Sequence, residues 1–228
     1  MKNKIIIIVL IVLGVGLAVS VGIYFIKQND SPTDSFENVA QQDQGGVPAN
    51  LNSKMQEETM GDVGTNNQAK AVQFSNKLVT DDFSLDIPAG WIKTEPPIGA
   101  SAMAVNMNED INDPAAKKIN FKSYLAVSYD TFQGKTMNEY IQTVKDSILQ
   151  TIPNVIFSNE QDILVNDRPA HAIEAELVQQ GVGFKILMAV IAGEGEDIWV
   201  ITFNTTKSSW DGYKEMFYGI VNSFTLKK

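Results

Sequence analysis

The chain has 228 residues, a formal net charge of −9 and no cysteine. The lack of cysteine excludes disulfides, thiol catalysis and cysteine-bound clusters, and the acidic balance argues against binding to nucleic acid, whose phosphates it would repel. The sequence contains a single histidine, so zinc, copper and haem sites of the usual kinds are not expected either.

An uncharged apolar stretch covers residues 5–26. As a helix it would be about 33 Å long, enough to cross a bilayer core of about 30 Å. Lys2 and Lys4 precede the stretch and only Lys27 closely follows it, so the positive-inside rule predicts a cytoplasmic N-terminus and an extracytoplasmic C-terminal domain. We therefore expect residues 1–27 to be a single-pass transmembrane anchor in the cell membrane.

Two alternatives remain open for this segment. A cleaved signal peptide would have a shorter apolar core and a small-residue cleavage site, for which Ala18-Val19-Ser20 is the candidate, although apolar residues continue beyond it. That alternative would still export the rest of the chain. The reverse orientation of a retained anchor would instead leave the domain in the cytoplasm.

The stretch that follows, residues 28–72, is rich in Gln, Asn, Asp, Ser and Gly, and its apolar residues are isolated. Such a segment buries too little apolar surface to offset the entropy lost on ordering, so we expect a disordered acidic linker. Residues 73–228 are then long enough for one globular domain.

Apolar runs in this domain predict a series of strands, over 83–88, 100–107, 124–132, 155–165, 169–178, 182–192 and 197–204. The later ones are joined by short turn-forming links such as Asn166-Asp167 and Gln180-Gly181, which favour an antiparallel meander. Residues 186–192 and 198–203 are apolar on both faces, which indicates central strands covered on both sides.

Two helices are expected. Thr136 and Glu139 have the spacing of a capping box, and apolar residues then recur at helical spacing, so a helix is predicted over 136–151. A second capping box, with Ser208 as N-cap and Asp211 three residues later, begins the closing helix.

The closing helix carries an apolar, mainly aromatic stripe, formed by Trp210, Tyr213, Phe217, Ile220, Val221 and Phe224. The stripe could line a partner groove, but packing on the sheet is the favoured interpretation. Together these elements predict the α+β class, with a mainly antiparallel sheet flanked by helices in an α/β/α sandwich.

Several of these segments together resemble the PsbP-like domain family, namely FSLDIPAGW (83–91), the helix TMNEYIQTVKDSI (136–148), the hairpin around NDRPA (166–170) and the closing helix that ends at Phe224. That family includes an extrinsic protein of photosystem II and shares its fold with the Ran-binding import factor Mog. The resemblance implies a non-enzymatic accessory or binding domain. It also implies packing or turn roles for the matching residues, Phe83, Pro88, Gly90, Trp91 and Phe224.

Carboxylates and amides are the remaining candidates for chemistry. Asn108, Asp110 and Asn112 alternate like the start of a calcium loop, although the central glycine and the distant glutamate of such a loop are missing. An ordinary solvated loop is the favoured interpretation, and calcium is the one cofactor left open.

Two further sites come from one predicted strand. Glu174 and Glu176 share a face of the strand over 169–178, either as paired acids or as solvated side chains. His171 lies on the other face with Ile173, Ala175 and Leu177, as expected for a structural histidine.

No catalytic constellation is evident in the sequence. We therefore expect a membrane-tethered extracytoplasmic accessory domain that binds an unknown protein or small molecule. The alternatives are a carboxylate-dependent hydrolase and a calcium-binding domain.

Overall fold

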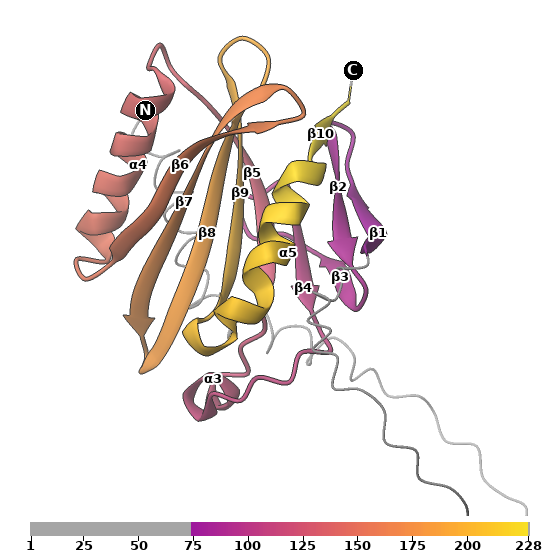
Figure 1. Ribbon diagram of the computed structural model, residues 1–228, viewed down its shortest axis with the longest axis vertical. Helices are drawn as coiled ribbons and strands as arrows, with labels where there is room; N and C mark the ends of the chain where they lie inside the picture. The colour runs from indigo at the N-terminus through magenta and orange to yellow at the C-terminus, as the bar shows by residue number, and fades with distance from the viewer. Residues whose placement is uncertain (1–73, 228) are drawn as a thin grey trace, which may run out of the picture.

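The computed structural model describes residues 74–227, and the expected anchor (1–27) and linker (28–72) lie outside them. Within the described part of the chain, no helix is both long enough and apolar enough to span a bilayer. The described residues form an α+β domain that is mainly antiparallel sheet, as the apolar runs predicted (Figure 1).

Seven strands form the main sheet in the order β3-β4-β5-β9-β8-β7-β6, with every neighbouring pair antiparallel. Their bounds are β3 Trp91–Thr94, β4 Ala102–Asn106, β5 Tyr124–Thr131, β6 Ile156–Val165, β7 Arg168–Gln179, β8 Val182–Ala192 and β9 Asp197–Thr206. β8 and β9 lie in the middle of the sheet and are buried along most of their length. Their position confirms the expectation from runs that are apolar on both faces.

The last four strands of this sheet form the predicted meander. At the β6–β7 link, Asn166 and Asp167 have φ of 47° and 64°, and at the β7–β8 link Gln180 and Gly181 have φ of 52° and 78°. Two consecutive left-handed residues suit the type I′ turn, whose twist matches that of the paired strands. Asn, Asp and Gly adopt this conformation at little cost, which is why these links were readable from the sequence.

A second, smaller sheet has the order β1-β2-β10, with bounds β1 Phe74–Val79, β2 Phe83–Pro88 and β10 Thr225–Leu226. The sequence predicted only β2. β1 exposes both Phe74 and Val79, and β10 has two residues, so neither carries a clear alternation. β3 was likewise missed, because the expected turn after Pro88 ends sooner than its residues suggested and Trp91 begins a new strand.

One face of the main sheet is covered by α4 (Met137–Thr151), which buries Tyr140 and Val144 in a core shared with β7, β8 and β9. The predicted capping box is confirmed. Thr136 Oγ1 accepts from the Glu139 amide at 3.3 Å, and the Glu139 carboxylate accepts from the Thr136 amide at 2.8 Å. A short helix that was not predicted, α3 (Pro114–Lys118), adds Ala116 to the same core.

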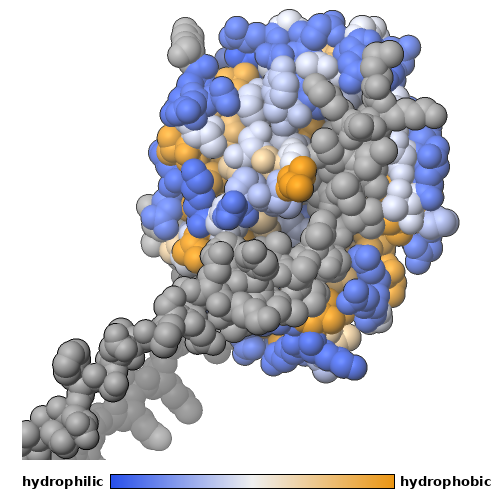
Figure 2. Space-filling model, turned by 180° about the vertical axis from the view of Figure 1, so that it is seen from behind, coloured by the Kyte–Doolittle hydropathy of each residue, from blue (hydrophilic) through white to orange (hydrophobic). Residues whose placement is uncertain are grey.

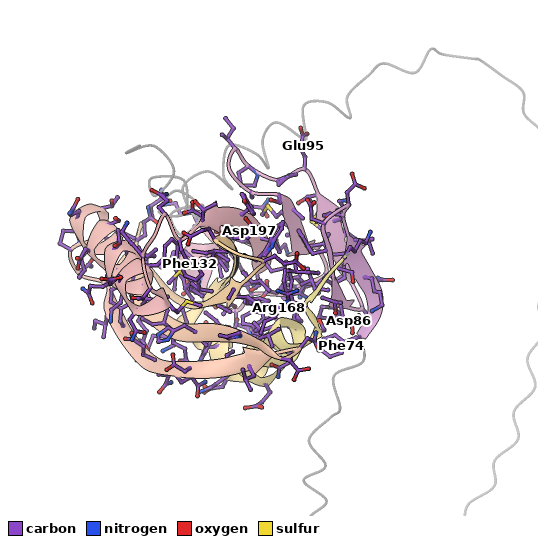
Figure 3. All side chains as sticks on the ribbon, turned by 90° about the horizontal axis from the view of Figure 1, so that it is seen from above. Phe74, Asp86, Glu95, Phe132, Arg168 and Asp197 are labelled. Atoms are coloured by element: carbon purple, nitrogen blue, oxygen red, sulfur yellow. The ribbon has the colours of Figure 1, made fainter. Side chains whose placement is uncertain are left out.

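The opposite face is covered by α5 (Trp210–Ser223) and the smaller sheet. Phe217, Ile220 and Val221 are fully buried there, so the aromatic stripe packs on the sheet as favoured. From above, α4 and the β1–β2 pair lie on opposite sides of the molecule, with Phe132 toward α4 and Asp86 toward β1 (Figure 3).

The predicted capping box at Ser208 is wrong. A 3₁₀ turn, η1 (Lys207–Ser209), precedes α5, and the N-cap residue Ser209 makes no side-chain capping bond. The Thr206 hydroxyl lies 3.0 Å from the Ser208 hydroxyl and 2.9 Å from the Ser209 hydroxyl. Both serine hydroxyls therefore bond to Thr206, the last residue of β9, and not to the first turn of the helix.

Candidate functional site

The residues that match the PsbP-like family lie on the α5 side of the main sheet. Phe83, Trp91 and Phe224 are buried in the core beneath α5. Pro88 ends β2, and Gly90 has φ of +85° in the turn before β3, where a Cβ would also approach the Asn108 side chain at 3.3 Å. A side chain there would be strained by the left-handed conformation and by this contact.

The proposed calcium ligands Asn108, Asp110 and Asn112 are all exposed. Asp110 forms an ion pair with Lys117 at 3.4 Å, and the neighbouring Asp113 caps α3. Among the residues that the structure describes, no group of three or more His, Asp or Glu side chains could hold a metal ion. A calcium site in this loop stays a prediction.

Glu109, from the same loop, turns inward. Its carboxylate accepts from the Ser123 amide at 2.6 Å and from the Ser123 hydroxyl at 2.8 Å, and it is 9% exposed. Glu109 therefore fixes the loop to the start of β5. This role was not apparent from the sequence, where Glu109 was one of several acidic residues in a loop.

His171 is buried on the α4 face, which it shares with Ile173, Ala175 and Leu177 as expected. Its Nδ1 lies 2.7 Å from Asp162 Oδ1, and its Nε2 lies 3.2 Å from Glu160 Oε1. Both carboxylates belong to β6, so the histidine joins β7 to that edge strand.

The two glutamates of β7 differ from the expectation of solvated side chains. Glu174 is 1% exposed, and its Oε2 lies 3.1 Å from Lys185 Nζ on β8. The partly buried Glu176 pairs with the same lysine at 3.0 Å and with Lys207 at 2.6 Å. The acids are thus paired with lysines instead of with each other, because α5 covers this face of the strand.

Lys185 is the residue that sequence reasoning missed. It is 6% exposed, and its Nζ lies 5.5 Å from the centroid of the Trp210 ring. The signal was present, since a lysine within the apolar run VGFKILMAVIA must find a counter-charge if that strand is buried. Register sets the pair, because Lys185 lies opposite Glu176 in the β7–β8 ladder.

A second side of α5 faces these charges. Trp210, Lys214 and Tyr218 are spaced four residues apart, so they form one stripe beside the apolar stripe of Phe217. Lys214 Nζ lies 3.2 Å from Glu174 Oε1, and the Tyr218 hydroxyl donates to the same oxygen at 3.3 Å. The helix therefore supplies both apolar cover and partners for the glutamate.

Next to Glu174, the edge strand β6 contains a β-bulge between Ser158 and Gln161. Ser158 pairs with Glu174 and Gln161 pairs with Ala172, so two residues of β6 face one residue of β7. Asn159, inside the bulge, has φ of 49°. Bulges of this kind redirect side chains and are common beside functional sites.

An open hollow of about 470 Å³ lies between β6, β7 and α5. It is lined by Asn159, Glu160, Gln161, Glu174, Lys214, Glu215 and Tyr218. Asn166 of the β6–β7 turn donates to the Phe224 carbonyl at 2.6 Å, which fixes the end of α5 to the hairpin. This hollow is the candidate functional site.

The pKa values of the acidic groups in the site follow from their ion pairs and hydrogen bonds. Burial opposes ionisation of Glu174, but hydrogen bonds from Asn159, Lys185 and Lys214 outweigh it and lower its pKa. Hydrogen bonds from Lys207 and Lys185 lower the pKa of Glu176. Burial and the nearby Glu174 charge raise the pKa of Tyr218 to about 12.

These shifts bear on the hydrolase alternative. A carboxyl group that acts as a general acid must hold its proton near neutral pH, which requires a raised pKa. The pKa values of Glu174 and Glu176 are both shifted the other way, by the lysines that already pair with them, which argues against either as a general acid.

Comparison with solved structures finds similar folds. The cyanobacterial PsbP (CyanoP) of Synechocystis sp. PCC 6803 has a TM-score of 0.50 at 14% identity, with 72% of this chain and 99% of that chain covered. The described domain has a PsbP-like fold. This confirms the fold that the resemblance implied, while at 14% identity the PsbP-like likeness extends to the fold alone.

Two other structures show weaker similarity. LpqN of Mycobacterium tuberculosis, described as involved in cell envelope biogenesis, has a TM-score of 0.47 at 13% identity and covers 64% of this chain and 83% of its own. The Ran-binding protein Mog1p of Saccharomyces cerevisiae has a TM-score of 0.43 at 15% identity and covers 63% and 89%. No protein-family model and no curated protein sequence matches the chain.

Proposed function

We propose that this protein is an accessory domain, tethered to the cell membrane by residues 5–26, that binds a partner protein on the extracytoplasmic side without catalysing a reaction. The tether and orientation rest on the length of the apolar stretch and on the lysines before it. Binding rests on the described domain.

The observation that carries the binding role is the hollow between α5 and the β6 bulge. It brings together charged side chains from three elements, and Glu174 at its base is fixed by two lysines and a tyrosine. Concave sites with a few well-placed polar groups are typical of ligand and partner recognition. By contrast, on the side shown in Figure 2 the visible hydrophobic residues form separate small groups among hydrophilic ones.

Site-specific photo-crosslinking in intact cells tests the binding role. A photoreactive residue replaces Gln161, which lines the hollow, or Glu95, which is exposed after β3 at the opposite edge of the sheet. We expect a discrete crosslinked product from position 161 and none from position 95. Equal products from both positions, or none from either, would contradict binding at the hollow.

The orientation has its own test. A C-terminal epitope tag on the full chain should be digested when protease is added to intact cells or to spheroplasts. A tag that stays protected until the membrane is permeabilised would exclude the extracytoplasmic location.

A further inference from the structure

His171 faces a carboxylate at each of its two ring nitrogens. Nδ1 lies 2.7 Å from Asp162 Oδ1 and Nε2 lies 3.2 Å from Glu160 Oε1, while the histidine itself is 7% exposed. Ionised carboxylates only accept hydrogen bonds, and a neutral imidazole has a single N–H group to donate. Only the protonated ring, which has an N–H group at both nitrogens, can therefore bond to both carboxylates at once.

The charged partners of His171 come from β6, with α4 behind them. Asp162 and Glu160 belong to β6, and Lys145 of α4 lies 2.7 Å from Glu160 Oε2. The hydrogen bond from this lysine, with a smaller contribution from His171, holds the pKa of Glu160 below its ordinary value, so this carboxylate is ionised near neutral pH. On the other side, the β8 neighbour of His171 is Val190, which carries no charge.

These contacts lie beside an interruption of the β6–β7 ladder. Asp162 is paired directly with His171, but the register shifts between Ser158 and Gln161, and Glu160 lies inside that bulge. A bulge disrupts the backbone hydrogen bonds of the ladder locally. β6 is also an edge strand, with β7 as its one strand neighbour in the described sheet. The side-chain contacts of His171 therefore supplement backbone bonds at the place where the bulge weakens them.

We propose that His171 is a pH-dependent clasp for β6, which fastens this strand to β7 when the ring is protonated and releases it in part when the ring is neutral. When the ring loses a proton to water, one nitrogen presents a lone pair to a carboxylate, and that contact becomes repulsive. The Asp162 side chain is 83% exposed and turns readily to water, whereas Glu160 keeps Lys145. Asp162 is therefore the carboxylate that leaves. Since Gln161 lies between the two acids and lines the hollow, the clasp holds one rim of the candidate site.

Hydrogen exchange of the β6 backbone amides tests the clasp. Histidine is the side chain whose charge ordinarily changes between about pH 5 and 8, and this chain has one histidine. Exchange into the full-length chain is followed by mass spectrometry at pH 5.5 and pH 8 and corrected for the intrinsic rate at each pH. We expect β6 to exchange about two- to fivefold more slowly at pH 5.5, the size of one partly exposed ion pair. The opposite edge strand, β3, contains no histidine and should show no difference.

Variants assign the effect to the clasp. His171→Gln keeps hydrogen-bonding groups but cannot change its charge, so the pH difference in β6 should disappear. Asp162→Asn removes the charge of the carboxylate that leaves and should reduce the difference. Glu95→Gln removes a carboxylate at the opposite edge of the sheet and should leave the difference as in the wild type (Figure 3).

Two results would overturn the proposal. One is equal or faster corrected exchange of β6 at pH 5.5 in the wild type, and the other is a pH difference that persists in His171→Gln. If His171→Gln does not fold, the exposed Asp162→Asn decides instead, and an unchanged difference in that variant overturns the clasp. The measurement involves no partner, so its outcome is separate from that of the crosslinking experiment.

Discussion

The two faces of β7 have very different environments. On the α4 side, Ile173, Ala175 and Leu177 lie in an apolar core, whereas on the α5 side Glu174 and Glu176 meet lysines. The α4 side needs only apolar side chains of suitable volume. The α5 side needs a lysine partner for each glutamate, because a buried charge without a counter-charge is costly. Strand alternation thus shows which residues share a face without showing whether that face is solvated.

The largest loss of stability is expected from Lys185→Met, on the α5 side of β7. The variant removes one of the two lysines from the buried Glu174 and leaves Lys214, Tyr218 and Asn159 as its partners, so we expect a loss of about 3 kcal/mol in the free energy of unfolding, measured by urea denaturation of the full-length chain. The double variant Glu174→Gln/Lys185→Met should recover part of this loss. A loss below about 1 kcal/mol in the single variant would show that the ion pair is not required.

On the apolar face, Ile173→Ala should cost about 3 kcal/mol, from lost burial and the cavity left behind. Ile173 is 1% exposed, so little relaxation is available. The loss should be the same at pH 4 and pH 7, because no charged group is removed. Leu164→Ala, at a position that is 69% exposed, serves as the control and should cost less than about 0.5 kcal/mol.

Acid should reduce the stability that Glu174 and Glu176 contribute on the α5 side of β7, and leave the contribution of the apolar α4 side unchanged. The pKa of Glu174 and of Glu176 is lowered in the folded state, so above the ordinary glutamate pKa of about 4.3 both are ionised and their contribution is complete. As the pH falls from about 5 toward the folded-state values, the unfolded chain takes up protons first, and stability is lost.

We expect this acid loss to be about 1.5–3 kcal/mol, the size of hydrogen bonds to charged groups. It should be smaller in Glu174→Gln/Glu176→Gln, as measured by thermal unfolding between pH 3 and pH 6. Ile173→Ala should keep the wild-type pH dependence and shift the whole curve downward. Identical pH profiles for the wild type and the double glutamine variant would contradict the assignment.

The smallest effects compare the starts of the two long helices. Thr136→Ala removes a capping box from α4 and should cost about 1 kcal/mol. Ser209→Ala removes a residue that makes no capping bond to α5, and should cost less than about 0.5 kcal/mol. Equal losses in thermal unfolding would show that Ser209 contributes to the helix start after all.

Much of the fold could be predicted from the sequence, because its signals are local. The Asn166-Asp167 turn, the capping box at Thr136 and the long apolar runs each depend on residues that are neighbours in the chain. The second sheet could not be predicted in the same way. β10 has two residues and exists only because the end of α5 brings Thr225 beside Ser84 of β2.

The candidate site was less predictable, since it depends on how α5 crosses the sheet. Glu174 and Glu176 were recognised as sharing a face, but their burial and their lysine partners follow from tertiary packing. The β6 bulge is a mismatch between two strands, and nothing in β6 alone marks it. Lys185 was the one accessible clue, as a charge inside an otherwise apolar strand.

β6 also has a consequence for how copies of the domain behave when crowded. It forms one border of the main sheet, and along its middle it presents Glu160 and Asp162 together with an irregular pairing at Asn159. The unpaired backbone groups of an edge strand can pair with another chain and cause aggregation. Natural proteins prevent this with charged side chains and bulges on the edge strand. Two such borders brought together would oppose carboxylate to carboxylate, so this side of the molecule resists self-association.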